Sequence, residues 1–587
     1  MNKKKLLIAA AVVAAIILIG VPVYKRETAL LYMTPYQSVP SSFGETYFSG
    51  KKVLFVVPHE DDEYNIGSGI MEKYVDSGSE IKVVFVTNGD MYGGAHIRVA
   101  ESTACAKVVG IPEENLLFLG YGDSWASEKY GHIYNAPGDE VVTSAFGATK
   151  TYATDEHPDY RTAKTGKSAD YTRNNIKQDI REIIEDFRPD AIYAIDLDEH
   201  WDHRAVSLLF EEVMGEILHD DESGYVPGVF KGFGYCTAWD AAPDFYAINV
   251  GATVNPGGSD IMDKNPEYLW SERTRLPVAE RYLARTKRSS AAYSAIEAFD
   301  TQFGMRNFRK IVNSDKVFWE RRSDGISYKA DVAVSSGNAG VLNDFKLMDL
   351  ADVNEETTFG EKGIWIPAAD DNERRAQYTF DKPADVHSIV LYGNPSPSDN
   401  ITEGVLEFDD GSTISVGPLP SNGSRYEAVV DKKGVSQVSF RIVSHEGDKA
   451  GLSEMEVYTS AHSAYEEENA FIKIMADDNF IYDYLAEPDG QLDLQIYSYP
   501  SDLVGDINMI SVSVDGEAAE GVEKKDGHIL IPYDGGEHHI EMRLGDTPIY
   551  DTIRVRPLRI TDRIEIPALQ KIEEIRDRKR EEVIEEG

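Results

Sequence analysis

An acidic cluster with one histidine follows a strongly apolar run near the start of the chain. In VLFVVPHEDDEYNIG, residues 53–67, five apolar residues lead into a proline, His59 and four acidic residues. Residues three apart lie on one face of a helical turn, so His59 and Asp62 can bind one ion. A solvated loop would explain the acidic residues alone, whereas a metal site explains both these residues and an imidazole beside a buried strand.

A second segment of the same kind lies further along the chain. In AIYAIDLDEHWDHRA, residues 191–205, an apolar run leads to His200 and His203, with Asp202 between them. Two imidazoles and one carboxylate with an open coordination position are typical of catalytic zinc, with iron, cobalt or nickel as alternatives. Such an ion lowers the pKa of bound water to about 7, and a nearby carboxylate can take its proton. Asp61 suits that role, and capping of the following helix is its alternative.

The elements that position these residues alternate between strands and helices. KKVLFVV, EIKVVFVTNG and NLLFLGYGD are mostly continuous apolar runs, and stretches with helical periodicity separate them. Continuous runs are typical of strands that are buried on both faces of a parallel sheet. We therefore predict an α/β Rossmann-like fold with a parallel sheet over about residues 51–320. In such a sheet ligands bind beyond the carboxyl ends of the strands, where both segments lie.

The rest of the chain has a different pattern. Alternating strands and turn clusters after the α/β region predict all-β domains. The predicted parts are an N-terminal membrane anchor or signal segment (1–26), a linker (27–50), the α/β domain (51–322), a jelly-roll β-sandwich (327–460), an immunoglobulin-like sandwich (465–560) and a charged C-terminal helix (561–587).

The N-terminal residues predict the cellular location of the protein. Lys3, Lys4 and Lys5 precede a long apolar run, and Lys25 and Arg26 follow it. The run is long enough to cross a bilayer, and the leading lysines favour a cytoplasmic start with the remaining domains outside. A cleaved signal peptide is the alternative. We predict a single-pass membrane protein with extracytoplasmic domains, or a secreted protein if the segment is cleaved.

The composition argues against some classes of function. The 587 residues carry 59 basic and 101 acidic side chains, which gives a formal net charge of −42. This charge repels phosphate backbones, so we do not expect nucleic acid as a partner. Cys105 and Cys236 form no CxxC pair, so neither a disulfide framework nor a thiolate metal site is expected. The sequence identifies no protein partner.

Four motifs of the α/β region together resemble a known family. PHEDDE, the following TNGD, an R-x-x-E helix and the late HWDH resemble the PIG-L/LmbE-like zinc-dependent N-acetylglucosamine deacetylases. The resemblance implies a general base at Asp61 and three zinc ligands, His59, Asp62 and His203. Glu60 stands where the motif of the family usually has a proline.

The same resemblance implies further roles. His200 matches the histidine that the family places over the oxyanion, with indirect support of the metal site as the alternative. Asp202, between the two histidines, would orient them. Arg98 and Glu101 match a pair near the sugar, with a surface ion pair as the alternative, and Asp123 matches an acidic position after the third strand.

The first all-β region also has a resemblance. VAVSSGNAG, HSIVLYGNPSPSDNI, GVLEFDDGS and a closing AGLSEMEVY, within about residues 327–460, resemble a discoidin-type domain. Members of that family often bind glycans, so the resemblance implies carbohydrate binding. Trp365 and Tyr392 are more typical of a core than of a glycan platform.

We therefore expect a metal-dependent amidohydrolase at the cell surface. It would remove the N-acetyl group from an N-acetylglucosamine-containing glycan or glycoconjugate. One alternative is an inactive surface protein that binds glycans or mediates adhesion, and another is a hydrolase for a different N-acyl group. The intact set of expected ligands favours an active enzyme.

Overall fold

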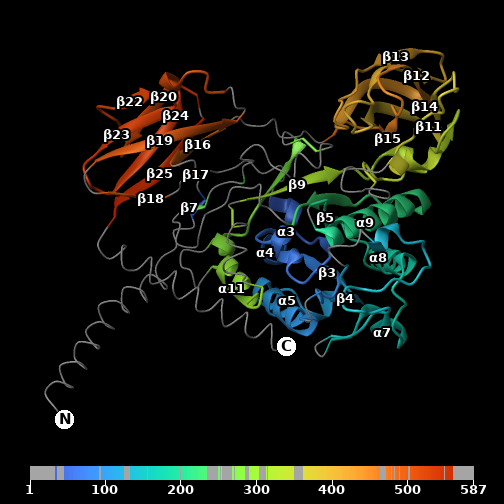
Figure 1. The fold of residues 1–587 in the computed structure, drawn as a ribbon, viewed down its shortest axis with the longest axis horizontal. Coiled ribbons are helices and arrows are strands. Elements are labelled where there is room, and N and C mark those ends of the chain that lie inside the picture. Colours follow the sequence, from blue (N-terminus) through green and yellow to red (C-terminus); the bar gives the residue numbers. More distant parts are fainter. Residues whose placement is uncertain are drawn as a thin grey trace, which may run out of the picture.

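The computed structural model of the protein contains an α/β domain and two β regions (Figure 1). It describes residues 45–91, 94–124, 132–154, 157–198, 200–234, 272–283, 290–302, 315–349, 361–462, 471–476, 483–487, 490–499, 503–547 and 549–558, with the short pieces 34–35, 249–250, 253, 268–269, 312–313 and 479–480.

A mixed seven-stranded sheet forms the centre of the α/β domain. Its order is β4 (Leu116–Tyr121), β3 (Glu80–Thr87), β2 (Lys52–Val57), β5 (Ala191–Ile195), β6 (Gly228–Gly232), β9 (Asp315–Arg321) and β8 (Thr274–Pro277). The first five strands are parallel, as predicted. The prediction of a parallel sheet is wrong for β9, which is antiparallel to both β6 and β8. These two strands add an antiparallel edge beyond the last parallel strand, which is common in large α/β sheets.

Helices pack around this sheet (Figure 1). They are α3 (Asp62–Gly67), α4 (Ile70–Asp76), α5 (Ala95–Val109), α6 (His132–Asn135), α7 (Tyr160–Thr165), α8 (Arg173–Phe187), α9 (Trp201–Asp220) and α11 (Ala291–Ala298). α8 shows why the sequence folds this way, because its buried Ile176, Ile180 and Ile184 recur every four residues. Thr172 caps its start by accepting a hydrogen bond from the Asn175 amide.

The first β region forms a six-stranded antiparallel sheet. Its strands are β10 (Asp331–Val334), β11 (Arg375–Gly393), β12 (Ile401–Phe408), β13 (Thr413–Val416), β14 (Arg425–His445) and β15 (Leu452–Tyr458). Trp365 and Tyr392 are buried, which confirms that both are core residues. The β-sheet character of this region matches the sequence, and the jelly-roll topology stays a prediction.

The second β region contains two five-stranded sheets. One consists of β17 (Asn479–Phe480), β16 (Phe471–Ala476), β19 (Gly490–Tyr499), β23 (His528–Tyr533) and β22 (Glu523–Lys525). The other consists of β18 (Asp483–Ala486), β25 (Tyr550–Pro557), β24 (His538–Leu544), β20 (Ile510–Val514) and β21 (Glu517–Ala518). Apolar side chains from both sheets form one core, which is the arrangement of a sandwich. A further short pair joins β1 (Thr34–Pro35) to β7 (Asn249–Val250).

The two predicted terminal elements, 1–26 and 561–587, lie outside the described residues, and so does Cys236. Cys105 is buried in α5 and forms no disulfide. Within the described part of the chain, every helix is too short or too polar to cross a membrane.

A buried ionic network joins the α/β domain to the first β region. Arg321 at the end of β9 lies between Glu211 of α9, at 3.9 Å, and Glu456 of β15, at 3.4 Å. Glu456 also accepts a hydrogen bond from Tyr328. The two backbones also pack closely. A Cβ atom at Gly215 of α9 would lie 2.3 Å from the carbonyl oxygen of Asp344, in the segment that enters this β region. The β region therefore packs against the helix that begins with the HWDH motif.

We predict that Arg321→Ala destabilises the protein by about 3–5 kcal/mol, because it leaves the buried Glu456 carboxylate without its counter-ion, whereas Glu211 keeps Lys231 at 2.8 Å. Urea unfolding followed by tryptophan fluorescence measures this change. Lys433→Ala is the control, because Lys433 is exposed and pairs with Asp385 at the surface. Equal stability of the two variants would show that the buried network contributes little.

Candidate active site

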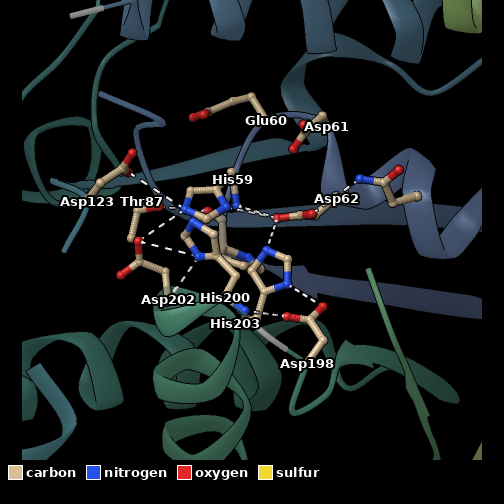
Figure 2. Close-up of polar contacts among 12 residues, drawn as sticks. His59, Glu60, Asp61, Asp62, Thr87, Asp123, Asp198, His200, Asp202 and His203 are labelled. Carbon is tan, nitrogen blue, oxygen red and sulfur yellow. Dashed lines mark hydrogen bonds and ion pairs between the residues drawn. The ribbon is translucent and has the colours of Figure 1, made fainter. Parts of the chain in front are cut away.

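The two predicted segments meet at the carboxyl end of the sheet (Figure 2). β2 and β5 are adjacent parallel strands, so the residues that follow each strand reach the same edge. His59 and Asp62 lie at the turn from β2 into α3, and His203 lies in the first turn of α9. All three side chains are buried. The structure thus brings together residues that are more than a hundred positions apart in the sequence.

One carboxylate oxygen lies between two imidazoles. Oδ2 of Asp62 is 3.1 Å from Nδ1 of His59 and 3.1 Å from Nε2 of His203. Atoms that share one tetrahedral zinc ion at ordinary bond lengths lie about 3.3 Å apart. A nitrogen from each of His59, His200 and His203 can be chosen so that the three atoms lie within 4.8 Å of one another. The geometry therefore suits a shared divalent ion.

Two further aspartates fix the orientation of these imidazoles. Nδ1 of His203 lies 2.6 Å from Oδ2 of Asp198, so its N–H donates there and Nε2 is left to face Asp62. Nε2 of His59 lies 3.2 Å from Oδ2 of Asp202, which leaves Nδ1 to face Asp62. A carboxylate behind a ligating imidazole is the usual support of a metal site.

Asp198 was not among the predicted site residues, although it lies in the predicted segment. It precedes His203 by five positions, and only the turn between β5 and α9 brings the two side chains together. Gly234, after β6, is a second missed residue. A Cβ atom there would lie 2.9 Å from Cε1 of His203 and 3.1 Å from Oδ1 of Asp62, so a bare backbone is needed to close this side of the site.

His200 is oriented by its position at the start of α9. It is the N-cap residue, and its Nδ1 accepts a hydrogen bond from the Asp202 amide at 3.2 Å. In the neutral ring the proton is then on Nε2, which makes this nitrogen a donor. The His200 ring lies 4.6 Å from that of His59 and 4.8 Å from that of His203, measured between centroids. His200 therefore presents an N–H group beside the two orientated imidazoles.

Asp123 lies on the far side of His59 from Asp62. Its Oδ1 is 4.0 Å from Nε2 of His59, and its Oδ2 accepts a hydrogen bond from the Met91 amide. Oδ1 is buried and accepts no hydrogen bond from the described residues. The Ser124 amide bonds to Asp202 at 3.2 Å, so the loop after β4 also supports the carboxylate behind His59.

Asp61 is paired with Arg98 rather than used as a helix cap. Nη2 of Arg98 lies 3.1 Å from Oδ1 of Asp61, and the Asp61 side chain makes no capping hydrogen bond. Glu60 is buried beside it and points away from the three imidazoles in Figure 2. The helix-capping alternative for Asp61 is therefore wrong.

Glu101 makes contacts that differ from a surface pair with Arg98. Its carboxylate accepts hydrogen bonds from the Thr301 amide, at 2.6 Å, and from Nε2 of Gln302, at 3.1 Å. Gln302 also donates to the carbonyl oxygen of Glu60 at 2.8 Å. Arg98 thus holds the turn through the Asp61 side chain. Glu101 holds the same turn through Gln302, which bonds to the backbone carbonyl of Glu60. Gln302 was missed because it follows α11, far along the chain.

The buried carboxylates favour a positive charge on the neighbouring imidazoles. Burial by itself lowers the pKa of His203, but Asp198 and Asp62 outweigh it and raise this pKa to about 10. Burial raises the pKa of Asp62, but His203 and His59 outweigh it and hold this pKa well below its usual range. A divalent cation would supply the same positive charge without protonation of the imidazoles. The donor set of imidazoles and carboxylates therefore fits a metal ion.

Two other shifts concern groups beside these ligands. Burial, followed by the charges on His59 and His203, lowers the pKa of His200 to about 3, so His200 is a neutral donor. Burial raises the pKa of Asp61, and Arg98 opposes this rise. A buried carboxylate with a raised pKa holds a proton more readily than one in water.

Comparison with known families covers two parts of the chain. Residues 54–214 match the family model described as PIG-L, GlcNAc-PI de-N-acetylase. This match confirms the predicted resemblance to PIG-L/LmbE-like deacetylases over the segment that contains both halves of the site. Residues 326–458 match the model of a domain of unknown function, DUF7402. The resemblance of that region to discoidin-type domains stays a prediction.

The individual relatives match this chain either over a small part of their length or at low sequence identity. A probable N-acetylglucosaminyl-phosphatidylinositol de-N-acetylase from Dictyostelium discoideum is 40% identical over 68 residues, which are 12% of this chain and 26% of that protein. The N,N'-diacetylchitobiose deacetylase from Pyrococcus horikoshii is 20% identical, with 33% of this chain and 64% of that chain covered and a TM-score of 0.22. A deacetylase of teicoplanin biosynthesis, solved in complex with teicoplanin, is 14% identical, with 46% and 97% covered and a TM-score of 0.25.

We predict that Asp198→Asn weakens binding of a divalent metal by about 10–100-fold, because the carboxylate no longer orients His203. Titration calorimetry of the metal-free protein with zinc measures the affinity. Asp186→Asn is the matched control, since Asp186 lies at the surface of α8 and pairs with Lys164. Unchanged affinity in Asp198→Asn, or an equal loss in the control, would contradict the supporting role of Asp198.

Proposed function

We propose that this protein is a zinc-dependent deacetylase that hydrolyses the N-acetyl amide of an N-acetylglucosamine-containing glycan or glycoconjugate. The observation that carries the proposal is the convergence of His59, Asp62 and His203 on one point, with Asp61 and His200 beside it. The family match over residues 54–214 supports the same reaction.

We assign three residues to hold the ion and others to move protons. His59, Asp62 and His203 would bind zinc, which when bound polarises a carbonyl group and lowers the pKa of a water molecule. Asp61 would take the proton of the attacking water, and its raised pKa suits a base that must later return a proton. Asp61, which then holds that proton, would pass it to the departing amine, and His200 would remain a neutral hydrogen-bond donor. Arg98 keeps the Asp61 carboxyl group in place.

His200 would stabilise the negative charge that develops on the acetyl oxygen. Its Nε2–H group is fixed in direction because Nδ1 already accepts a bond from the Asp202 amide. A preorganised donor of this kind needs no rearrangement during the reaction. Asp202 therefore orients two imidazoles: its amide bonds to His200, and its carboxylate bonds to His59. We place Arg98, Glu101 and Asp123 near the sugar as substrate-binding residues.

The decisive experiment measures acetate released from a panel of N-acetylated sugars by the purified, zinc-loaded protein. We expect release from substrates that contain N-acetylglucosamine. Binding of glycans without any release, in protein that holds its metal, would instead favour the adhesion alternative. Release from other N-acyl groups alone would favour the other amidohydrolase.

Two variants separate the proposed roles. Asp61→Asn should lower kcat by about 10²–10⁴-fold because it removes the general base. His200→Asn should lower kcat by about 10²–10³-fold because it removes the oxyanion donor, although asparagine still suits the N-cap of α9. Both variants should keep their metal by elemental analysis. Wild-type kcat in either variant would refute the role given to that residue, and Asp186→Asn is again the control.

The other parts of the chain suggest where the reaction takes place. We propose that residues 1–26 anchor the protein in a membrane, or are cleaved from it, with the described domains outside the cytoplasm. We further propose that the 327–460 region is a discoidin-type domain that binds carbohydrate. The charge pattern around the apolar N-terminal run and the motifs of that region support these proposals. Protease added to intact cells should digest the domains if they are exposed.

A further inference from the structure

A fully buried lysine lies behind the turn that joins β5 to α9. Lys231 belongs to β6, the neighbour of β5 in the sheet, and its side chain has no exposed surface. Its Nζ donates to Oγ of Ser207 at 2.7 Å and to Oε1 of Glu211 at 2.8 Å. The same Nζ lies 3.6 Å from Oδ1 of Asp196. One ammonium group therefore links β6 to two turns of α9 and to the residue that directly follows β5.

The charges around this lysine compensate one another. A buried ammonium group is stable only if it is paired and hydrogen-bonded, and Asp196 and Glu211 supply two carboxylates. Arg321 adds a second positive charge at 3.9 Å from Glu211. The cluster is thus balanced by its own side chains, in contrast to the carboxylates around His59 and His203. We therefore look for its role in the backbone that it holds rather than in an ion that it would bind.

That backbone is the start of the turn that leads to the site. Oδ1 of Asp196 accepts hydrogen bonds from the Leu197 amide at 2.8 Å and from the Ser207 hydroxyl at 3.0 Å. The Asp196 amide donates to the carbonyl oxygen of Gly232 at 2.8 Å. All these groups are buried, so water cannot readily replace any of them. The position of the turn therefore depends on contacts with both β6 and α9.

The turn passes this position on to a ligating imidazole. Asp198 lies two residues after Asp196, and its Oδ1 accepts a hydrogen bond from the His200 amide at 2.9 Å. Its Oδ2 lies 2.6 Å from Nδ1 of His203. The carboxylate of Asp198 is thus held by the same short turn that Asp196 begins. A displacement of Asp196 would move the group that sets the direction of the His203 ring.

We propose that Lys231 is a positioning residue for metal binding. Through Ser207 and Asp196 it fixes the turn that directs His203 at the shared point. This inference rests on the proposed function in one respect, because it takes His203 as a metal ligand. Lys231 lies in β6, outside the two segments that supply the site residues, and it acts only through other side chains.

The test compares full-length wild type with Lys231→Met, which replaces the ammonium group by an apolar chain of similar length. Calorimetric titration of the metal-free protein should show zinc binding about tenfold weaker, because the support of His203 is no longer fixed. The visible absorption bands of the cobalt-loaded protein should also change, since they report the coordination geometry. Wild-type zinc affinity together with a wild-type cobalt spectrum would overturn the proposal.

A milder variant keeps the test decisive if Lys231→Met fails to fold. Ser207→Ala removes the hydroxyl group between Lys231 and Asp196, and alanine suits the interior of α9. It should weaken zinc binding less than Lys231→Met does and change the cobalt spectrum in the same direction. Ser388→Ala is the matched control, because the Ser388 hydroxyl is equally buried and makes no hydrogen bond with any described residue.

Urea unfolding of each variant separates a positioning role from a merely structural one. Loss of stability in Ser207→Ala with unchanged zinc affinity and cobalt spectrum would overturn the proposal. Neither readout needs a substrate. If no substrate releases acetate but the variants still bind zinc more weakly, the deacetylase function fails and the role of Lys231 stands. If the wild type binds neither zinc nor cobalt, the role of Lys231 is refuted together with the metal site.

Discussion

Buried negative charge at the carboxyl end of one sheet is the constraint on which the site depends. Asp62, Asp198 and Asp202 are almost fully buried among the three imidazoles. Carboxylates in such a place are stable only if positive charge or hydrogen-bond donors compensate for the lost water. The imidazoles supply part of this compensation, and a divalent cation between His59 and His203 would complete it. The same shortage of positive charge that would destabilise a structural core therefore suits this place to a bound cation.

The positions of these groups follow from the way parallel strands end. β2 and β5 are neighbours in the sheet, so the turns after them lie side by side although the sequence separates them widely. α9 then adds His200, Asp202 and His203 within a single turn. His59 and His203 each have a carboxylate behind the ring, which fixes the nitrogen that faces the Asp62 oxygen. The chemistry is built from two adjacent turns and a helix start rather than from mobile loops.

The first β region is joined to this framework and does not stand apart from it. Its segment near Asp344 packs on the backbone of α9 at Gly215, and the buried Arg321 lies between acidic residues of both domains. A helix that carries site residues at its start is thus braced along its length. This connection sets the two domains in one orientation.

The parallel strands, the two segments rich in histidine and aspartate, and the β-sheet regions could be predicted from local sequence patterns. This was possible because a strand buried on both faces is apolar, and a site of imidazole and carboxylate ligands places histidines and acidic residues close together at a strand end, and both patterns are local. The antiparallel edge at β9, the support of His203 by Asp198, and the contacts of Gln302 and Gly234 with the site became visible only in the folded chain. These depend on which distant segments pack together. No local pattern encodes such pairings, because the residues involved are ordinary ones until the fold brings them together.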